Sequence, residues 1–311
     1  MGMMLKRMLF LLLVLSAVIL SGCGSSTDAG SGKVYFLMHT DVGNGFNEDL
    51  KQTLLAKGKA AGVEIEVLDA KGDSNVQLDQ MNKAIEEKAG AIVLVACDGD
   101  AILPAVKKAN EAGIPIIRVN RDINAGQFVS SLSDDREAGK MQGEFMAKNL
   151  PPDAQIVYMS GEMTQGAAIK RWEGFKEACL DKRPDVKLLA SADCGWNRAD
   201  ALKQMTLWLK IFPKIDGIVG ANDDMVLGAL QIMKDNNRLA GVWASGVDAT
   251  DEALKAVQAG TMSQTVKQDA KGLGAGAFEL VQAALSGNKS QADVVVPFMS
   301  ITSDNIGQFL K

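Results

Sequence analysis

Short apolar runs alternate along the chain with segments in which apolar residues recur every three or four positions. The short runs predict buried strands, and the longer spacing predicts helices that bury one face. In the first part of the chain the expected strands are 34–38, 63–68, 91–96 and 114–119. The helices between them are marked by Phe46, Leu50 and Leu54, by Leu78, Met81 and Ile85, and by Ile102, Val106 and Ala109. Strands and helices that alternate over short connections form a parallel sheet covered on both faces.

The same alternation starts again after Ser133. The expected strands are 156–159, 186–190, 215–220 and 242–247, and the expected helices are 135–150, 168–179, 202–212, 225–234 and 251–259. A chain of 311 residues is also longer than one hydrophobic core usually serves. Two complete sets of strands therefore predict two similar, doubly wound α/β lobes. The stretch 262–268 and the helix after it, up to Leu285, come too late for a simple tandem repeat.

Polar side chains stand at the carboxyl ends of the expected strands. In open parallel sheets ligands bind outside that edge, so two facing lobes would bring both sets of residues around one cleft. The residues are Thr40, Asn44, Asp69, Asp98, Asn120, Arg121, Ser160, Trp196, Asn222, Asp223, Asp248 and Gln268. Amide, carboxylate and guanidinium groups beside one indole suit a small ligand that has hydroxyl groups and an apolar face.

The first 22 residues have the pattern of a secretory signal peptide. Lys6 and Arg7 precede an apolar run from 8 to 20, which is too short to span about 30 Å of hydrocarbon. The sequence Leu20-Ser21-Gly22-Cys23 resembles a bacterial lipobox, which implies that Cys23 carries a lipid. The alternative is an ordinary signal peptide followed by an incidental cysteine. Residues 23–32 are predicted to form a flexible tether, so the mature protein would work outside the cytoplasm on a bacterial membrane.

Composition and charge exclude several classes of protein. With 47% hydrophobic and 23% charged residues, the chain is not disordered as a whole. Removal of Lys6 and Arg7 takes the net charge from −5 to −7, and so acidic a chain binds nucleic acid poorly because phosphate contacts come from Lys and Arg. His39 is the single histidine, which argues against a histidine-based catalytic centre or zinc site. We expect no metal and no cofactor.

The cysteines after Cys23 number three, so at least one of them is free. The chain is large enough to form a core without disulfides. Cys97 follows an apolar strand and Cys179 lies in a helix, and we expect both to be packing residues. A bridge between Cys179 and Cys194 remains an alternative.

From about Lys33 to its end the chain resembles the type I periplasmic sugar-binding proteins of ABC transporters. The matching segments are Gly43-Asn44-Gly45-Phe46, residues 116–121, residues 167–175 with Arg171, Trp196, Ala221-Asn222-Asp223-Asp224-Met225, Gly246-Val247-Asp248-Ala249, and residues 265–270 with Gln268. The resemblance implies two lobes joined by a three-segment hinge, with crossings near Ser133, Val266 and Pro297. It assigns 33–132 and 268–296 to the N-terminal lobe, and 133–267 and 297–311 to the C-terminal lobe.

The strand ends and the resemblance together imply a ligand site of ten residues. They are Thr40, Asn44, Phe46, Asn120, Arg121, Arg171, Trp196, Asn222, Asp248 and Gln268. Asp248 and Asn222 could instead be helix caps. We assign both to the ligand, and Asp223 to capping or to the hinge. His39 is expected to be structural, and Trp208 to lie in the core.

Departures from the family pattern bear on the identity of the ligand. Asn47 stands where ribose-type proteins have a second stacking phenylalanine, which disfavours ribose. Asn44 replaces an aspartate of the glucose/galactose type, and Gln165 and Ala167 replace its histidine and aspartate. Residues 69–73 and 296–305 are most similar to the inositol and rhizopine-binding branch. We therefore expect a neutral monosaccharide or cyclitol, with an inositol or a hexose ahead of ribose.

The leading interpretation is a monomeric, lipid-tethered receptor that closes about its hinge on a sugar or cyclitol and delivers it to an ABC transporter permease. It could instead present the ligand to a membrane chemoreceptor or sensor kinase. A secreted enzyme lacks support, because the sequence has no Gly-x-Ser-x-Gly, no His-Glu-x-x-His and no triad that His39 could serve. A sugar-responsive transcription factor is disfavoured, since the signal peptide occupies the place of a DNA-binding domain.

Overall fold

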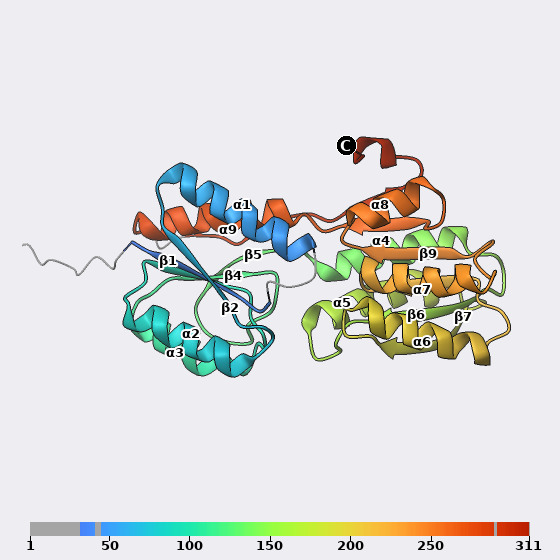
Figure 1. Cartoon of the computed structure of the whole chain (residues 1–311), viewed down its shortest axis with the longest axis horizontal. Coiled ribbons are helices and arrows are strands. Elements are labelled where there is room, and N and C mark those ends of the chain that lie inside the picture. The colour runs from blue at the N-terminus through green and yellow to red at the C-terminus, as the bar shows by residue number, and fades with distance from the viewer. Residues whose placement is uncertain (1–31, 41–44, 289–290, 311) are drawn as a thin grey trace, which may run out of the picture.

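The computed structural model describes residues 32–40, 45–288 and 291–310. Within them the chain forms two α/β lobes that lie end to end along the long axis of the molecule (Figure 1). The signal peptide, Cys23 and Asn44 lie outside the described residues. Among the residues that are described, no helix is long and apolar enough to cross a membrane.

The first lobe is built on a six-stranded sheet whose described pairings are all parallel. Its strand order is β11 (Val294–Val295), β5 (Val129–Leu132), β4 (Ile116–Val119), β3 (Ala91–Leu94), β1 (Val34–Met38) and β2 (Ile65–Asp69). Helices α1 (Gly45–Ala61) and α9 (Ala270–Leu285) cover one face, and α2 (Ser74–Glu86) and α3 (Leu103–Glu111) cover the other. In β1, Phe36 packs toward the first pair of helices and Leu37 toward the second, as the two-residue period of a strand requires.

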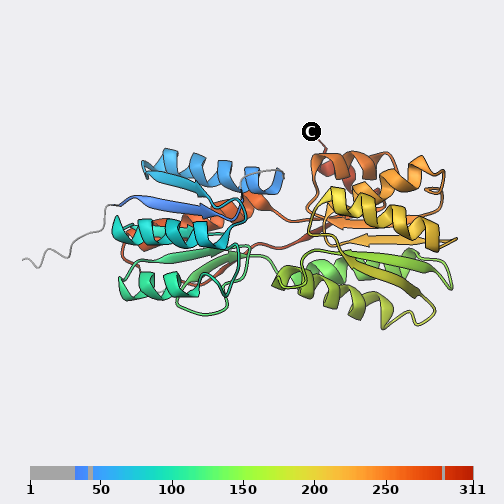
Figure 2. The same ribbon diagram turned by 60° about the horizontal axis from the view of Figure 1, so that its bottom comes forward.

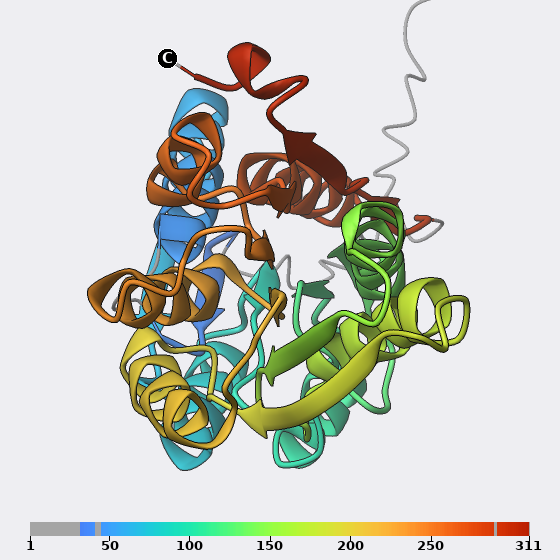
Figure 3. The same ribbon diagram turned by 90° about the vertical axis from the view of Figure 1, so that its right-hand side faces the viewer.

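The second lobe has the same plan, with one antiparallel edge. Its strand order is β12 (Met299–Thr302), β10 (Gln264–Lys267), β9 (Trp243–Val247), β8 (Gly217–Gly220), β6 (Gln155–Ser160) and β7 (Lys187–Asp193), and β12 runs antiparallel to β10. Helices α4 (Asp135–Asn149) and α5 (Gly166–Phe175), with the π-helical turn Lys176–Leu180, cover one face. Helices α6 (Arg198–Ile211), α7 (Asp223–Asp235) and α8 (Asp251–Gln258) cover the other (Figure 3). A short 3₁₀ turn, Ile306–Gln308, packs beside α8.

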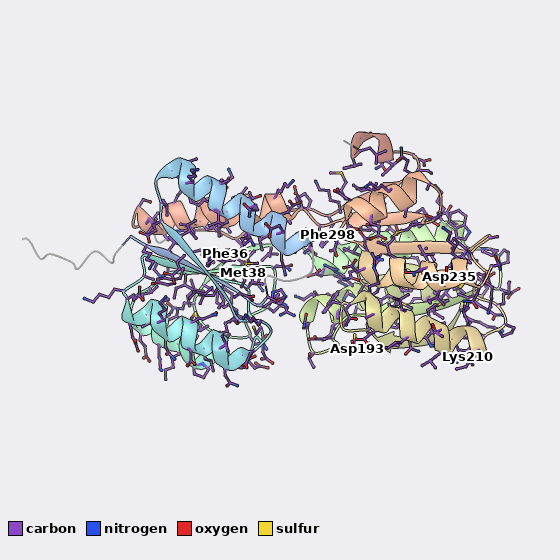
Figure 4. All side chains as sticks on the ribbon, viewed as in Figure 1. Phe36, Met38, Asp193, Lys210, Asp235 and Phe298 are labelled. Atoms are coloured by element: carbon purple, nitrogen blue, oxygen red, sulfur yellow. The ribbon has the colours of Figure 1, made fainter. Side chains whose placement is uncertain are left out.

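In the described part of the chain, three segments connect the lobes (Figure 2). They lie between β5 and α4, between β10 and α9, and between β11 and β12. The residues after Met262 depart from tandem order because α9 packs against α1 in the first lobe. Phe298 lies on the last segment, between the lobes, and packs with Ala138, Val247 and Val266 (Figure 4). The predicted fold class is confirmed.

Four strands were not predicted from the apolar pattern. One of them, β10, lies in the stretch 262–268. β5 reads Val129-Ser130-Ser131-Leu132, and both of its serines are buried. The Ser131 hydroxyl donates a hydrogen bond of 2.8 Å to the Leu273 carbonyl, which satisfies it inside the core. β11 and β12 pair at sheet edges over two and four residues, too few to give a periodic signal.

The cysteines at 97, 179 and 194 are free. Cys179 packs in the core beneath α4 and Cys194 packs in the core beneath α6 and α7. These cores lie on opposite faces of the second sheet, so the alternative of a Cys179–Cys194 bridge is wrong. Cys97 is half-buried and is not only a packing residue, because it lines the cavity between the lobes.

Candidate functional site: the cleft between the lobes

A cavity of about 370 Å³ lies between the carboxyl edges of the two sheets. This volume is within the range of small-molecule sites, about 300–1,000 Å³. The cavity brings together eight of the ten predicted residues: Phe46, Asn120, Arg121, Arg171, Trp196, Asn222, Asp248 and Gln268. Thr40 is not on its wall, and its carbonyl accepts a hydrogen bond of 3.0 Å from the Asn47 amide. Of the other strand-end residues, Asp98 lines the cavity, whereas Asp69, Ser160 and Asp223 do not.

Arg171 is held in place by close contact between α4 and α5. A Cβ atom at Gly139 would lie 2.0 Å from the Arg171 carbonyl oxygen, so glycine is needed for the two helices to approach. The buried guanidinium donates to Asp135 Oδ1 at 2.8 Å, to the Ala221 carbonyl at 2.6 Å and to Gln268 Oε1 at 3.1 Å. Most of its donors are thus used within the protein, and its charge is paired with Asp135.

Gln268 links the two lobes at the middle connecting segment. Its amide nitrogen donates a hydrogen bond of 2.9 Å from this connecting segment to Asn120 Oδ1 in the first lobe, while its side-chain oxygen accepts from Arg171 in the second lobe. Asn120 has φ +61°, in the left-handed region that asparagine tolerates better than most residues. A continuous chain of hydrogen bonds therefore runs from Asp135 through Arg171 and Gln268 to Asn120.

Arg121 projects from the end of β4 toward the end of β3. One of its terminal nitrogens donates to the carbonyls of Ala96 at 3.0 Å and of Cys97 at 3.3 Å. Burial lowers the pKa of the guanidinium, and the nearby Glu162 raises it. The second terminal nitrogen has no partner among the described residues, so it is available to a ligand.

Trp196 lies in the turn after β7, with φ +60°. Its indole nitrogen donates 3.0 Å to Gln165 Oε1, and its ring lies 5.5 Å from the Arg171 guanidinium. A Cβ atom at Gly161 would lie 2.0 Å from the indole, so only glycine leaves room for the ring there. The indole is half-buried in the cavity wall and is fixed in orientation.

Two aspartates of the second lobe interact beneath the cavity. Asp223 is fully buried and accepts hydrogen bonds from the Thr250 amide at 2.9 Å and the Thr265 hydroxyl at 2.7 Å. Burial raises its pKa, and the charge of Asp248 raises it further. Burial also raises the pKa of Asp248, against the opposing effect of Arg171. No group among the described residues donates a hydrogen bond to Asp248, whose carboxylate lies on the cavity wall.

Asn222 has two structural tasks. Its side-chain oxygen accepts 3.0 Å from the Met225 amide and so caps α7, and its amide nitrogen donates 3.0 Å to the Trp196 carbonyl. Of the two roles expected for Asp223, capping of α7 was therefore wrong, because the residue one position earlier is the cap. A role of Asp223 at the hinge stays a prediction. Asn222 also lines the cavity, where its second amide hydrogen remains open.

A family model described as a periplasmic binding protein domain matches residues 34–289. The chain belongs to the periplasmic binding protein family. A xylitol-binding protein of Mycolicibacterium smegmatis is 30% identical over 291 residues, which cover 92% of this chain and 82% of that protein. A putative rhizopine-binding protein of Rhizobium meliloti is 28% identical over 309 residues, which cover 96% of this chain and 98% of that one.

The solved structures include an ABC transporter solute-binding protein from Bacillus halodurans with bound myo-inositol. It is 29% identical to this chain, with a TM-score of 0.81, and the match covers 90% of this chain and 98% of that one. The resemblance inferred from the sequence is confirmed. Periplasmic binding proteins are non-enzymatic components of transport and sensing outside the cytoplasm, so the expectation that this chain is not an enzyme is also confirmed.

Sequence reasoning missed several residues on the cavity wall of this periplasmic binding protein. They are His39, Asp100, Asp122, Asn124, Glu162 and Thr164, together with Gly99 and Gly166. Asn47, Gln165 and Ala167, which the family resemblance compares with ligand positions, also line the cavity. Most of the missed residues lie in loops one to five residues beyond the strand ends. The expectation that ligand residues stand at the carboxyl ends of the strands does not extend along these loops. Asp122 also receives an ion pair across the cleft, 3.2 Å from the Lys170 ammonium. The described residues contain no cluster of three metal-ligating side chains.

Proposed function

We propose that this protein is the substrate-binding lipoprotein of an ABC transporter. It captures a neutral monosaccharide or cyclitol by closing about its hinge and delivers it, as a monomer, to the permease. The observation that carries the proposal is the cavity between the lobes, because residues of both lobes line it. A ligand that touches both walls binds the closed arrangement better than an open one, and so shifts the equilibrium between them.

The chemistry of the wall supports a polyol. Asp248 offers two acceptor oxygens, Arg121 has an open donor nitrogen, and Asn120 and Asn222 have amide hydrogens left over. Hydroxyl groups both donate and accept, so they can meet all of these groups. The indole of Trp196 can cover the C–H face of a ring.

A neutral ligand is favoured over an anionic one. Arg171 is already paired with Asp135, so it brings no unpaired positive charge to the cavity. Carboxylates of Asp98, Asp100 and Glu162 lie on the wall as well. An anion would meet this excess of negative charge, whereas a neutral polyol would not.

The relatives support the polyol class but do not choose a ligand within it. Those described above are named for, or hold, xylitol, rhizopine and myo-inositol, and others are ribose import binding proteins. Asn47 is buried and its amide is engaged with the Thr40 carbonyl, which supports the absence of a second stacking ring there. We therefore place an inositol or a hexose ahead of ribose.

Isothermal calorimetry on the purified protein tests the proposed ligand class. The panel is myo-inositol, xylitol, D-glucose and D-ribose, with citrate as the anionic control. We expect saturable binding of myo-inositol or glucose and none of citrate. Tight binding of ribose without the others would contradict the order of preference, and binding of citrate alone would overturn the neutral-polyol assignment.

Lipid attachment at Cys23 is tested in cells. Cys23→Ser should move the protein from the membrane fraction to the soluble extracytoplasmic fraction, because the thioether that carries the lipid cannot form. The matched control is Cys97→Ser, which should leave the protein in the membrane fraction. Retention of the Cys23→Ser protein at wild-type levels would show that Cys23 is not the anchor.

A further inference from the structure

We propose that His39 is a ligand-contacting, specificity-determining residue that donates a hydrogen bond from Nε2 to a hydroxyl oxygen of the bound polyol. The proposal rests on the function proposed above and adds a polar contact on the first-lobe wall. The sequence predicts a structural role for His39, whereas the structure places the residue on the wall of the cavity.

The backbone of His39 is fixed on two sides. Its carbonyl accepts a hydrogen bond of 2.7 Å from the Gly72 amide and a contact of 3.6 Å from the Cys97 thiol. These two partners come from the turn after β2 and from the end of β3, which flank β1 in the sheet. The side chain therefore leaves the end of β1 from a well-defined position at the cleft.

The imidazole itself has no protein partner among the described residues. Nδ1 is buried and makes no hydrogen bond, whereas Nε2 makes no hydrogen bond to a described residue and is not among the fully buried polar atoms of the described residues. A structural histidine usually satisfies at least one ring nitrogen, since an unpartnered buried polar group costs free energy. A ring with two open nitrogens on the wall of a ligand cavity is better explained by a partner that the ligand supplies.

The imidazole is neutral, which fixes what it can offer. Burial lowers the pKa of His39 to about 3, and the charge of Arg121 acts in the same direction. A neutral imidazole carries one N–H and one bare nitrogen. Buried N–H groups without acceptors are rarer than acceptors without donors, so the bare nitrogen belongs at Nδ1 and the N–H at Nε2. On this assignment Nε2 is the ring atom that can donate to a ligand in the cavity that His39 lines.

The test compares three variants by calorimetry with whichever of myo-inositol, xylitol, D-glucose or D-ribose binds the wild type. His39→Gln keeps an N–H donor at about the reach of Nε2 and should remain within about threefold of wild type. His39→Leu removes the donor, and the shorter side chain of His39→Asn carries an N–H that does not reach as far as Nε2. Each variant should weaken binding at least tenfold. Gln80→Leu is the matched control, because Gln80 is a polar side chain of the same lobe that does not line the cavity.

Thermal unfolding without ligand separates this contact from a structural role. Replacement of an unpartnered ring by leucine should leave the melting temperature of His39→Leu unchanged or raise it, while Gln80→Leu loses its hydrogen bond and should melt lower. Wild-type affinity in His39→Leu would overturn the inference. If that variant does not fold, equal affinities of His39→Gln and His39→Asn would overturn it. Failure of the wild type to bind any of the four would instead overturn the proposed function.

Discussion

At the scale of single residues, the cleft contains one carboxylate whose hydrogen-bonding capacity is unused. Asp248 lies on the cavity wall and accepts no side-chain hydrogen bond from the described part of the chain, while each carboxyl oxygen of its neighbour Asp223 accepts one bond, from Thr250 or from Thr265. Burial of an unpaired carboxylate is unfavourable, as the raised pKa of Asp248 indicates. Ligand hydroxyls would relieve that cost, which makes Asp248 the acceptor on which affinity should depend most.

Asp248→Ala is therefore expected to weaken polyol binding at least about tenfold, equivalent to about 1.4 kcal/mol. Hydrogen bonds to charged groups contribute about 1.5–3 kcal/mol, and the ligand hydroxyls would lose such partners. Calorimetry on wild type and variant measures the change. Asp224→Ala is a control, because Asp224 pairs with Arg198 and does not line the cavity. Unchanged affinity in Asp248→Ala would place the ligand elsewhere.

The same aspartate pair predicts a pH dependence of stability. A raised pKa means that the folded protein holds its proton more tightly than the unfolded chain does. Between about pH 4, the ordinary carboxyl range, and the raised pKa, the pair therefore lowers the free energy of unfolding as pH rises. Carboxylates elsewhere with lowered pKa values, such as Asp185, act in the opposite direction.

Asp223→Asn isolates the contribution of the pair. Its amide can still accept from the Thr250 amide and donate to the Thr265 hydroxyl oxygen, so the fold should persist. The free energies of unfolding of both proteins are measured in urea between pH 4 and pH 8, without ligand. The other carboxylates titrate in both proteins, so their contribution cancels in the difference. The stability of the variant relative to wild type should rise with pH across this window. Parallel profiles would show that the aspartates do not interact as described.

At the scale of elements, the site depends on how closely α4 and α5 approach. Glycines at 139, 143 and 174 let the two helices pack backbone to backbone. This contact places Arg171 between Asp135 and Gln268, and thus holds the inner end of the hydrogen-bond chain that reaches Asn120. The glycines support the site without lining it.

Gly139→Ala should destabilise the protein by about 1–3 kcal/mol, the usual cost of overpacking a tight contact. The added Cβ would lie 2.0 Å from a backbone oxygen, which cannot rotate away as a side chain could. Thermal or urea unfolding measures the loss. Gly307→Ala is the control, because a Cβ there meets nothing within 4 Å and Gly307 does not require a positive φ. Equal stabilities of the two variants would contradict the close approach.

At the scale of the whole molecule, the parts that followed local rules could be predicted from the sequence. The apolar run 34–38 is β1 at the same bounds, and the strand-end rule found Asn120, Arg121, Trp196 and Asp248. The serine-containing β5 gives no periodic signal, because its buried hydroxyls are satisfied by distant groups. The position of the His39 backbone depends on contacts with the end of β3 and with the turn after β2, which lie up to 58 residues away.

The arrangement of the lobes involves an ion pair that no local pattern indicates. Lys170 on α5 lies 3.2 Å from Asp122 of the first lobe, which also pairs with Arg118 at 2.5 Å. The Lys170 and Asp122 side chains are 48% and 30% exposed, so the pair is partly screened and worth at most about 1 kcal/mol. The pair joins the two lobes directly, so it stabilises the arrangement of the lobes that the structure shows. If this arrangement is the closed one of the proposed function, the pair favours closure.

Lys170→Met should therefore weaken polyol binding two- to fivefold, in line with a contribution of about 1 kcal/mol or less. Part of the ligand's binding free energy would then be used to close the lobes. The affinity of the wild type should fall toward that of the variant as salt rises from about 0.01 to 1 M, since screening weakens exposed ion pairs. The affinity of the variant should change less with salt. The matched control is Lys176→Met, which removes a similarly exposed lysine whose pair with Asp181 stays within the second lobe. Equal affinities of wild type and Lys170→Met at low salt would show that the pair does not affect closure.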